Sequence, residues 1–299
     1  MIYHYHPITE NSLIISIDNI VLDVWVSNPD IREMIEAEIS CLPRNEAELV
    51  TWEGGKPGTF RQQWLFKLND GTSFWLGHGL IGNGIAVERY RLEFNPNKVG
   101  DHPIFKVIHS LLVRYARKPL SRIARFDLAI DIPAERAKCF LVKDRRLYIE
   151  RRHGVEYTQY LGAKSSTVGR VKLYNKAAEA KLDYPLTRLE LTLDPATPYE
   201  DVNFPVVYYL NSASRVAERV KVTDTEKFIL NAILQGYGTL NDLGRKTRAK
   251  IETIMKQDVE TIHISSEAYA SVLKQLASYL TEETTNPNKK SGGQHNVEH

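Results

Sequence analysis

Cysteine is scarce in this chain of 299 residues, which contains only Cys41 and Cys139. These two lie far apart and match no spacing of metal ligands, so they predict no cysteine-based metal site, and a reducing compartment suits them best. No stretch approaches the roughly 18 consecutive apolar residues of a membrane-spanning helix. The first residues also lack the basic and then apolar run of a secretory signal. We therefore expect a cytoplasmic protein with no membrane partner.

A strong excess of charge of either sign is also missing. The chain has 39 Lys and Arg against 37 Asp and Glu, a net charge of +2, which neither requires nor excludes nucleic acid because local patches matter more than the sum. The basic residues gather with interleaved tyrosines at 114–118, 143–152, 164–181 and 245–250. Each cluster alone is equally well explained as solvated surface. Several in one near-neutral chain favour a surface that follows phosphates.

The order of hydrophobic patterns predicts an α+β fold, with an antiparallel central sheet, helices on one side and a helical C-terminal part. Strands are expected over 13–26, a hairpin around Asn69-Asp70-Gly71, and a further strand at ERYRLEFNP. Helices are expected over 29–40, 103–116, 224–235, 245–256 and 266–280. The residues from 284 onward have almost no apolar side chains and predict a disordered tail.

Three middle segments alternate polar and apolar residues with the period of a strand. They are RIARFDLAIDI (122–132), GRVKLYNKAAEAK (169–181) and TRLELTLD (187–194). One face of each is apolar, and the other carries the ionisable side chains Arg125, Asp127, Asp131, Arg170, Lys172, Tyr174, Arg188 and Glu190. If the strands are neighbours, these side chains form one polar face. A sheet with one solvated side would show the same alternation.

The combination of residue types on this face points to phosphoryl chemistry. Carboxylates on facing strands bind hard divalent ions such as Mg²⁺ or Mn²⁺, and such an ion polarises a phosphate oxygen. A nearby phenol can attack phosphorus and hold the cut strand as a phosphotyrosine ester. Free tyrosine has a pKa of about 10, so we expect Lys172, Lys176 or the metal to help Tyr174 ionise.

The order RFDLAIDI, YLGAKSSTVGRVKLYNKAAEAK, TRLELTLD resembles the trans-acting plasmid rolling-circle replication initiators of Gram-positive bacteria, most specifically over residues 88–195. The resemblance implies that Tyr174, in the Tyr-Asn-Lys motif, is the nucleophile. It implies that Asp127 and Glu190 hold Mg²⁺ or Mn²⁺, with Asp131 a weaker third candidate. It further implies a fold related to nicking-endonuclease (HUH-like) folds, nicking of double-strand origin DNA at a hairpin, a homodimer, and recruitment of a host helicase.

Other residues receive secondary assignments. Arg170 and Arg188 are expected to steady the phosphate beside Lys172 and Lys176. Glu179, five residues after Tyr174, either supports Lys176 or only solvates its helix. Residues that could bind DNA are Lys164, in a polar turn, and Arg245, Lys246, Arg248 and Lys250, in the basic segment of a possible helix-turn-helix. The same helices could instead form a cap that only packs on the sheet.

We therefore expect a catalytic nicking domain over 1–220, a helical region over 221–282 that could bind DNA, and a disordered tail over 283–299. The leading hypothesis is a plasmid initiator that nicks and religates origin DNA through a 5′-phosphotyrosine intermediate. Two alternatives stay open. One is a relaxase of a conjugative or integrative element, and the other is a DNA-binding regulator without catalytic activity.

Overall fold

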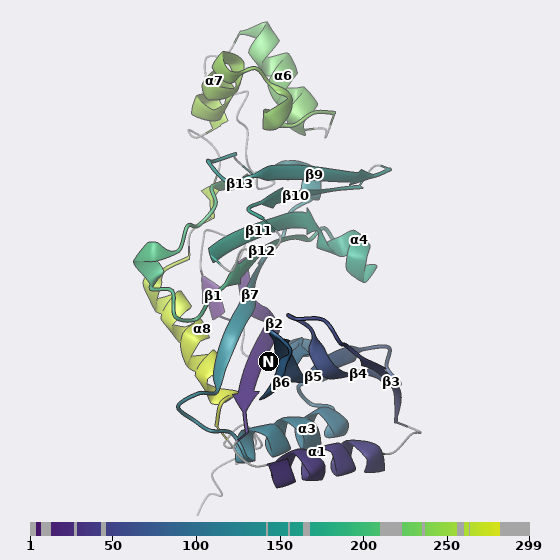
Figure 1. Ribbon diagram of the computed structural model, residues 1–299. Helices are drawn as coiled ribbons and strands as arrows, with labels where there is room; N and C mark the ends of the chain where they lie inside the picture. Colours follow the sequence, from purple (N-terminus) through teal and green to yellow (C-terminus); the bar gives the residue numbers. More distant parts are fainter. Residues whose placement is uncertain are drawn as a thin grey trace, which may run out of the picture. The chain divides into compact units, whose positions relative to one another are not determined.

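The computed structural model describes residues 4–6, 13–26, 29–42, 46–141, 143–154, 156–163, 168–209, 223–234, 237–255, 260–262 and 264–281. The chain divides into two compact units (Figure 1). Unit 1 comprises Met1–Val21, Asn95–Asn97 and Ala124–Val272, and unit 2 comprises Leu22–Phe94, Lys98–Ile123 and Leu273–His299. The expected boundary at 220/221 and the expected tail over 283–299 lie outside the described residues.

Unit 2 is built on antiparallel strands in the order β3, β4, β5, β6. Its elements are β3 (Ala47–Glu53), β4 (Phe60–Leu68), β5 (Ser73–Gly82), β6 (Ile85–Phe94), α1 (Pro29–Cys41) and α3 (Pro103–Arg114), with α2 (Pro96–Val99) at its border. The predicted hairpin is confirmed: Lys67 pairs with Ser73, and Gly71 has φ of 80°, a backbone conformation that favours glycine.

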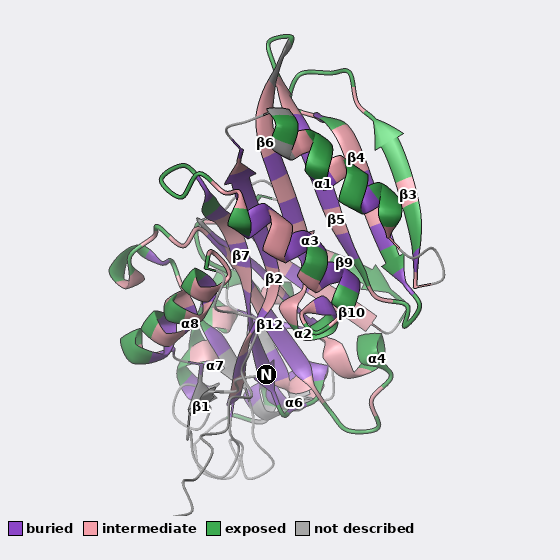
Figure 2. Cartoon of the chain, turned by 90° about the horizontal axis from the view of Figure 1, so that it is seen from below, coloured by how far each residue is buried: buried purple, intermediate pink, exposed green. Residues whose placement is uncertain are grey.

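Helix α3 covers this sheet with an apolar stripe. Phe105 packs edge-on against Phe74 at 5.4 Å and lies 4.6 Å from Phe94, both ring-centroid distances. His109, one turn later, is also buried and bonds through Nε2 to the backbone oxygen of Tyr279 at 2.9 Å. Figure 2 shows buried and partly exposed residues alternating along β6, where Tyr90, Leu92 and Phe94 are buried, as expected for a sheet with one covered face.

Unit 1 contains the strands that carry the chemistry-bearing motifs. Its sheet has the order β2, β7, β12, β11, β10, β9. The strands are β2 (Leu13–Trp25, to Val21 in this unit), β7 (Arg122–Ile132, from Ala124), β12 (Thr187–Leu193), β11 (Val168–Asn175), β10 (Glu156–Leu161) and β9 (Tyr148–His153), and β1 (His4–His6) pairs with β2. The three predicted strands are therefore neighbours, with β12 antiparallel to both β7 and β11.

The apolar faces of these three strands are buried, as the alternation predicts. No side chain among Phe126, Leu128, Ile130, Val171, Leu173, Leu189 and Leu191 exposes more than 1% of its surface. At about 25 cal/mol per Å² of apolar surface, this burial dominates the stability of the sheet and fixes which face each strand turns outward. Burial of the apolar face thus determines which side chains lie on the polar face described below.

The remaining elements of unit 1 are helices and a small second sheet. They are α4 (Lys176–Ala180), α6 (Asp224–Leu234), α7 (Arg245–Met255), α8 (Ser266–Ser278, which ends in unit 2), the short 3-10 helices η1 (Arg136–Lys138), η2 (Tyr199–Asp201) and η3 (Leu240–Asp242), and a small sheet of β8 (Cys139–Leu141), β13 (Val207–Tyr209) and β14 (Glu260–Thr261). Across the part of the chain that is described, no helix has the length and hydropathy to cross a membrane.

Candidate active site

The polar faces of β11, β12 and β7 align in three rows across the sheet. In the order β11, β12, β7, the rows are Arg170, Thr192, Asp127; then Lys172, Glu190, Ala129; then Tyr174, Arg188, Asp131. Directly opposed residues in an antiparallel pair have Cβ atoms about 4.5–5.5 Å apart, so each row brings its side chains into contact range. The register therefore assembles on one face nearly all the residues that the motifs single out.

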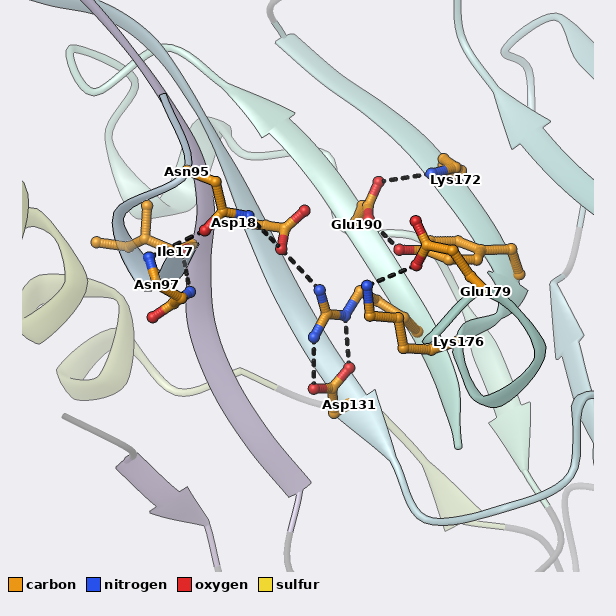
Figure 3. A network of polar contacts seen from close by, with 11 residues as sticks. Ile17, Asp18, Asn95, Asn97, Asp131, Lys172, Lys176, Glu179 and Glu190 are labelled. Carbon is orange, nitrogen blue, oxygen red and sulfur yellow. Dashed lines mark hydrogen bonds and ion pairs between the residues drawn. The ribbon is translucent and has the colours of Figure 1, made fainter. Parts of the chain in front are cut away.

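Tyr174 lies at the centre of this face. Its hydroxyl donates a hydrogen bond of 2.6 Å to Glu190 Oε1, and Lys172 Nζ lies 3.2 Å from Glu190 Oε2. The same Lys172 nitrogen is 3.8 Å from the centre of the Tyr174 ring. Figure 3 shows Lys172 and Glu190 reaching toward each other from neighbouring strands. The phenol is only 6% exposed, so this contact is well shielded from water.

The surroundings of Tyr174 keep its phenol protonated. Burial raises the pKa of the hydroxyl far above its ordinary value, and the charge of Glu190 and the hydrogen bond to it raise it further. Lys172 and Lys176, expected to favour the phenolate, lie beside the ring but do not outweigh these effects. Use of this hydroxyl as a nucleophile would therefore require transfer of its proton to an acceptor close by.

A second carboxylate, Glu179, lies on α4, where its charge acts on Tyr174. Asn175 precedes this helix, and its side chain accepts a hydrogen bond from the Ala178 backbone N–H at 3.1 Å. Lys176 Nζ contacts Glu179 Oε2 at 2.5 Å. Burial raises the pKa of Glu179, but the hydrogen bond and charge of Lys176 outweigh it and hold the pKa below its usual value. Glu179 therefore supports Lys176, one of the two roles that the sequence left open.

Arg188 is held by two carboxylates. Its Nε and Nη2 donate to both oxygens of Asp131 at 2.6 and 2.7 Å, and its Nη1 donates to Asp18 at 2.7 Å (Figure 3). Burial alone would lower the pKa of Arg188, but the contacts with Asp131 and Asp18 raise it above its ordinary value. These contacts use three of the five N–H donors of a guanidinium that was expected to steady a phosphate. Sequence reasoning missed Asp18, whose only signal is a polar residue in the alternation of β2.

Asp127 has a buried carboxylate oxygen that could bind a cation. Its Oδ1 is buried and has no hydrogen-bond partner among the described residues, although Thr192 bonds the same carboxyl group. Burial raises the pKa of Asp127, and the nearby charge of Glu190 raises it further. The two carboxylates are diagonal neighbours across β12 and β7, about 7–8 Å apart at the backbone.

The predicted metal ligands differ in how many of their oxygens are already engaged. Mg²⁺ is commonly held by one or two protein carboxylates together with substrate phosphates, and Asp127 fits such a site through its unpartnered Oδ1. Both oxygens of Glu190 accept hydrogen bonds, from Tyr174 and Lys172, so Glu190 would have to exchange one of them for the ion. Asp131 does not fit, because both its oxygens are held by the bidentate contact with Arg188. The described residues contain no group of three or more His, Cys, Asp or Glu side chains arranged to hold a metal ion.

The expected DNA-binding residues of α7 fall into two classes. Arg245 and Lys246 are exposed. Arg248 Nε donates to Glu252 at 2.7 Å, and Lys250 forms an ion pair with Glu226 of α6. The first pair is therefore available to a ligand, while the second pair has partners within the protein. Lys164 lies outside the described residues.

No family model matches the chain, and no curated protein matches its sequence. Among solved structures, the chain is similar to one described as a rolling circle replication initiator protein from Geobacillus stearothermophilus. The two share 14% sequence identity with a TM-score of 0.38, over 75% of this chain and 97% of the other. A similarity this low carries no structural argument, so the function is argued below from side chains and motifs.

Proposed function

We propose that the chain initiates rolling-circle plasmid replication by nicking and rejoining origin DNA, with Tyr174 as the nucleophile. The observation that carries the proposal is the hydrogen bond from the Tyr174 hydroxyl to Glu190, flanked by Lys172, on the face shared by the three motif strands. In this proposal, residues 1–220 form the catalytic part, related to nicking-endonuclease (HUH-like) folds.

Cleavage is a single displacement at phosphorus. The Tyr174 oxygen forms a bond to the scissile phosphorus, the bond from phosphorus to the 3′ oxygen breaks, and the 5′ phosphate stays on the enzyme. The phenol proton passes to Glu190, the carboxylate that accepts the hydrogen bond of the hydroxyl. The departing 3′ oxygen takes a proton from water and becomes the primer end. Reversal of these steps rejoins the strand without an outside energy source.

Cations on the same face neutralise the phosphate. Arg170 and Lys172 project from β11 beside Tyr174, whereas Arg188 aligns β12 with β7 and β2 through Asp131 and Asp18. Asp127 and Glu190 would hold Mg²⁺ or Mn²⁺, which when bound polarises a phosphate oxygen. Asp127 supplies an oxygen that no other described group engages.

Partners follow from the proposed role. A homodimer, a host helicase and a hairpin in double-strand origin DNA belong to the proposal through the sequence resemblance. Arg245 and Lys246 are exposed cations of α7 with no ion pair among the described residues, and they would contact the origin duplex. Sedimentation of the chain with and without origin DNA measures the assembly state.

A nicking assay tests the proposal. A supercoiled plasmid that carries the DNA flanking the gene of this chain is incubated with the protein and Mg²⁺ or Mn²⁺, and open circles are counted. We expect Tyr174→Phe to abolish nicking, while Tyr184→Phe, at a tyrosine that is 53% exposed, nicks like wild type. Equal nicking by Tyr174→Phe would refute the assignment. DNA binding with neither nicking nor a covalent adduct would identify a regulator. A nick in a transfer origin would identify a relaxase.

A further inference from the structure

Tyr160 of β10 lies between two arginines that come from the strands on either side. The guanidinium carbon of Arg151, on β9, is 5.8 Å from the centre of the Tyr160 ring, and that of Arg170, on β11, is 5.7 Å from it. Both distances are near the roughly 6 Å limit of a cation–π contact. The ring thus has one cation from each neighbouring strand within cation–π range.

This cluster belongs to the same face as Tyr174. Tyr160 pairs directly with Lys172 on β11 and with Ile149 on β9. It is thus a diagonal neighbour of Tyr174, about 7–8 Å away at the backbone, which is on the scale of one nucleotide step along an extended strand. Arg151 is exposed, Ile149 is 38% exposed, and Tyr160 and Arg170 are half-buried. An aromatic ring, an aliphatic side chain and two cations, all at least partly accessible, therefore lie beside Tyr174.

On the opposite face of the hairpin formed by β9 and β10, the arginines have partners. Arg152 is bound to Glu150 at 2.7 Å, and the Tyr157 hydroxyl accepts a hydrogen bond from the buried Arg136 at 3.3 Å. Neither Arg151 nor Arg170 forms an ion pair with any residue that the structure describes. Arg151 and Arg170 are therefore cations of the Tyr174 face whose charge no ion pair within the described residues offsets.

We propose that Tyr160, Arg151 and Arg170 form a subsite for an unpaired nucleotide next to the scissile phosphate. The base stacks on the Tyr160 ring, and the two guanidinium groups contact the phosphates on either side of it. Stacking of bases on aromatic rings beside a basic groove is the general way that proteins hold single strands. The choice of DNA as ligand rests on the proposed function, whereas the preference for an unpaired strand rests on the ring and cations alone.

Fluorescence anisotropy with a labelled single-stranded DNA oligonucleotide, without divalent ions, tests the subsite. We expect Tyr160→Leu to weaken binding about 5- to 100-fold, the range for loss of one stacked base, and Tyr160→Phe to bind like wild type. Arg151→Ala and Arg170→Ala should each reduce the slope of log affinity against log salt by about 0.7. Arg152→Ala, one residue along β9 on the other face, is the matched control and should leave that slope unchanged.

Three results would overturn the subsite. One is wild-type affinity in Tyr160→Leu, and another is an equal loss on the duplex of the same sequence, which would mean a contact with the backbone only. The third is an unchanged salt slope in both Arg151→Ala and Arg170→Ala. The proposed function fails separately, if Tyr174→Phe still nicks. Melting temperatures of all variants identify any that fail to fold. If Tyr160→Leu fails to fold, Arg151→Ala, at an exposed position, still tests the subsite.

Discussion

Tyr174 and Glu190 are separated by 16 residues in sequence, yet a hydrogen bond of 2.6 Å joins the phenol hydroxyl of one to Oε1 of the other. They lie on adjacent antiparallel strands, in neighbouring rows of one polar face. The bond has two consequences. It holds the hydroxyl in a fixed direction, and it couples removal of the phenol proton to the carboxylate that the sequence assigns to a metal.

Replacing Glu190 separates its chemical role from its structural one. Glu190→Gln keeps the size of the side chain and can still accept the bond from Tyr174, but it cannot take a proton. Because general acid–base groups contribute about 10²- to 10⁴-fold, we expect the nicking rate to fall by at least about 100-fold. Origin binding, measured by anisotropy, should stay within about 2-fold. The control Glu200→Gln, at an exposed carboxylate, should change neither the nicking rate nor origin binding. Equal losses of nicking and binding in Glu190→Gln would contradict the account.

Asp127→Asn tests the cation site. We expect nicking to be lost in both Mg²⁺ and Mn²⁺ while origin binding is retained, since the carboxylate would serve the ion and not the DNA. Burial disfavours the charged form of this carboxyl group, so the free energy of unfolding in a chelator should not fall. Full nicking by this variant would remove Asp127 from the site.

The Arg188 cluster makes a prediction about stability. Arg188→Ala leaves Asp131 and Asp18 without their shared cation in a buried setting, and removing one partner of a buried ion pair typically costs about 3–5 kcal/mol. Urea unfolding measures this loss. The matched control is Lys67→Ala, which breaks the exposed pair with Glu48 and should cost less than about 1 kcal/mol. Similar losses in the two variants would show that Arg188 does not hold the strands together.

His109 makes a prediction about pH. Burial lowers its pKa below the ordinary value of 6.5, although its bond to the Tyr279 backbone opposes this shift. The unfolded chain therefore takes up the proton first as the pH falls, so stability is full above about pH 6.5 and declines below it. We expect His109→Gln to lose less free energy of unfolding between about pH 7 and pH 5 than wild type. His153→Gln, at an exposed position, should decline like wild type; a decline in His109→Gln as steep as wild type would contradict the assignment.

The strands could be predicted from sequence because alternation with a period of two reports which side of a strand is buried. That is why the apolar faces of β7, β11 and β12 and the shared polar face were all predictable. Alternation does not report register or distant partners. The pairing of Arg188 with Asp18 joins residues 170 positions apart, and nothing near Asp131 indicates that Arg188 occupies both its oxygens. A metal ligand and an ion-pair partner look alike until their neighbours are known.

The ion pair of Glu179 and the surroundings of Tyr160 were unpredictable for a related reason. Glu179 contacts Lys176 because α4, which starts directly after β11, places residues three apart side by side on its surface. Tyr160 is one of 15 tyrosines, and only the pairing of β9, β10 and β11 shows that Arg151 and Arg170 flank it. Cross-strand neighbours, which decide the chemistry of a sheet face, come from tertiary structure.

The most direct test of the central claim is to map the covalent adduct between protein and DNA. The protein is incubated with Mg²⁺ or Mn²⁺ and an oligonucleotide that spans the nick site, denatured and digested, and the peptide carrying the 5′ phosphate is identified by mass. The account predicts that the modified residue is Tyr174 and that Tyr174→Phe yields no adduct. An adduct on Tyr160 or another residue, or efficient nicking with no adduct, would contradict it.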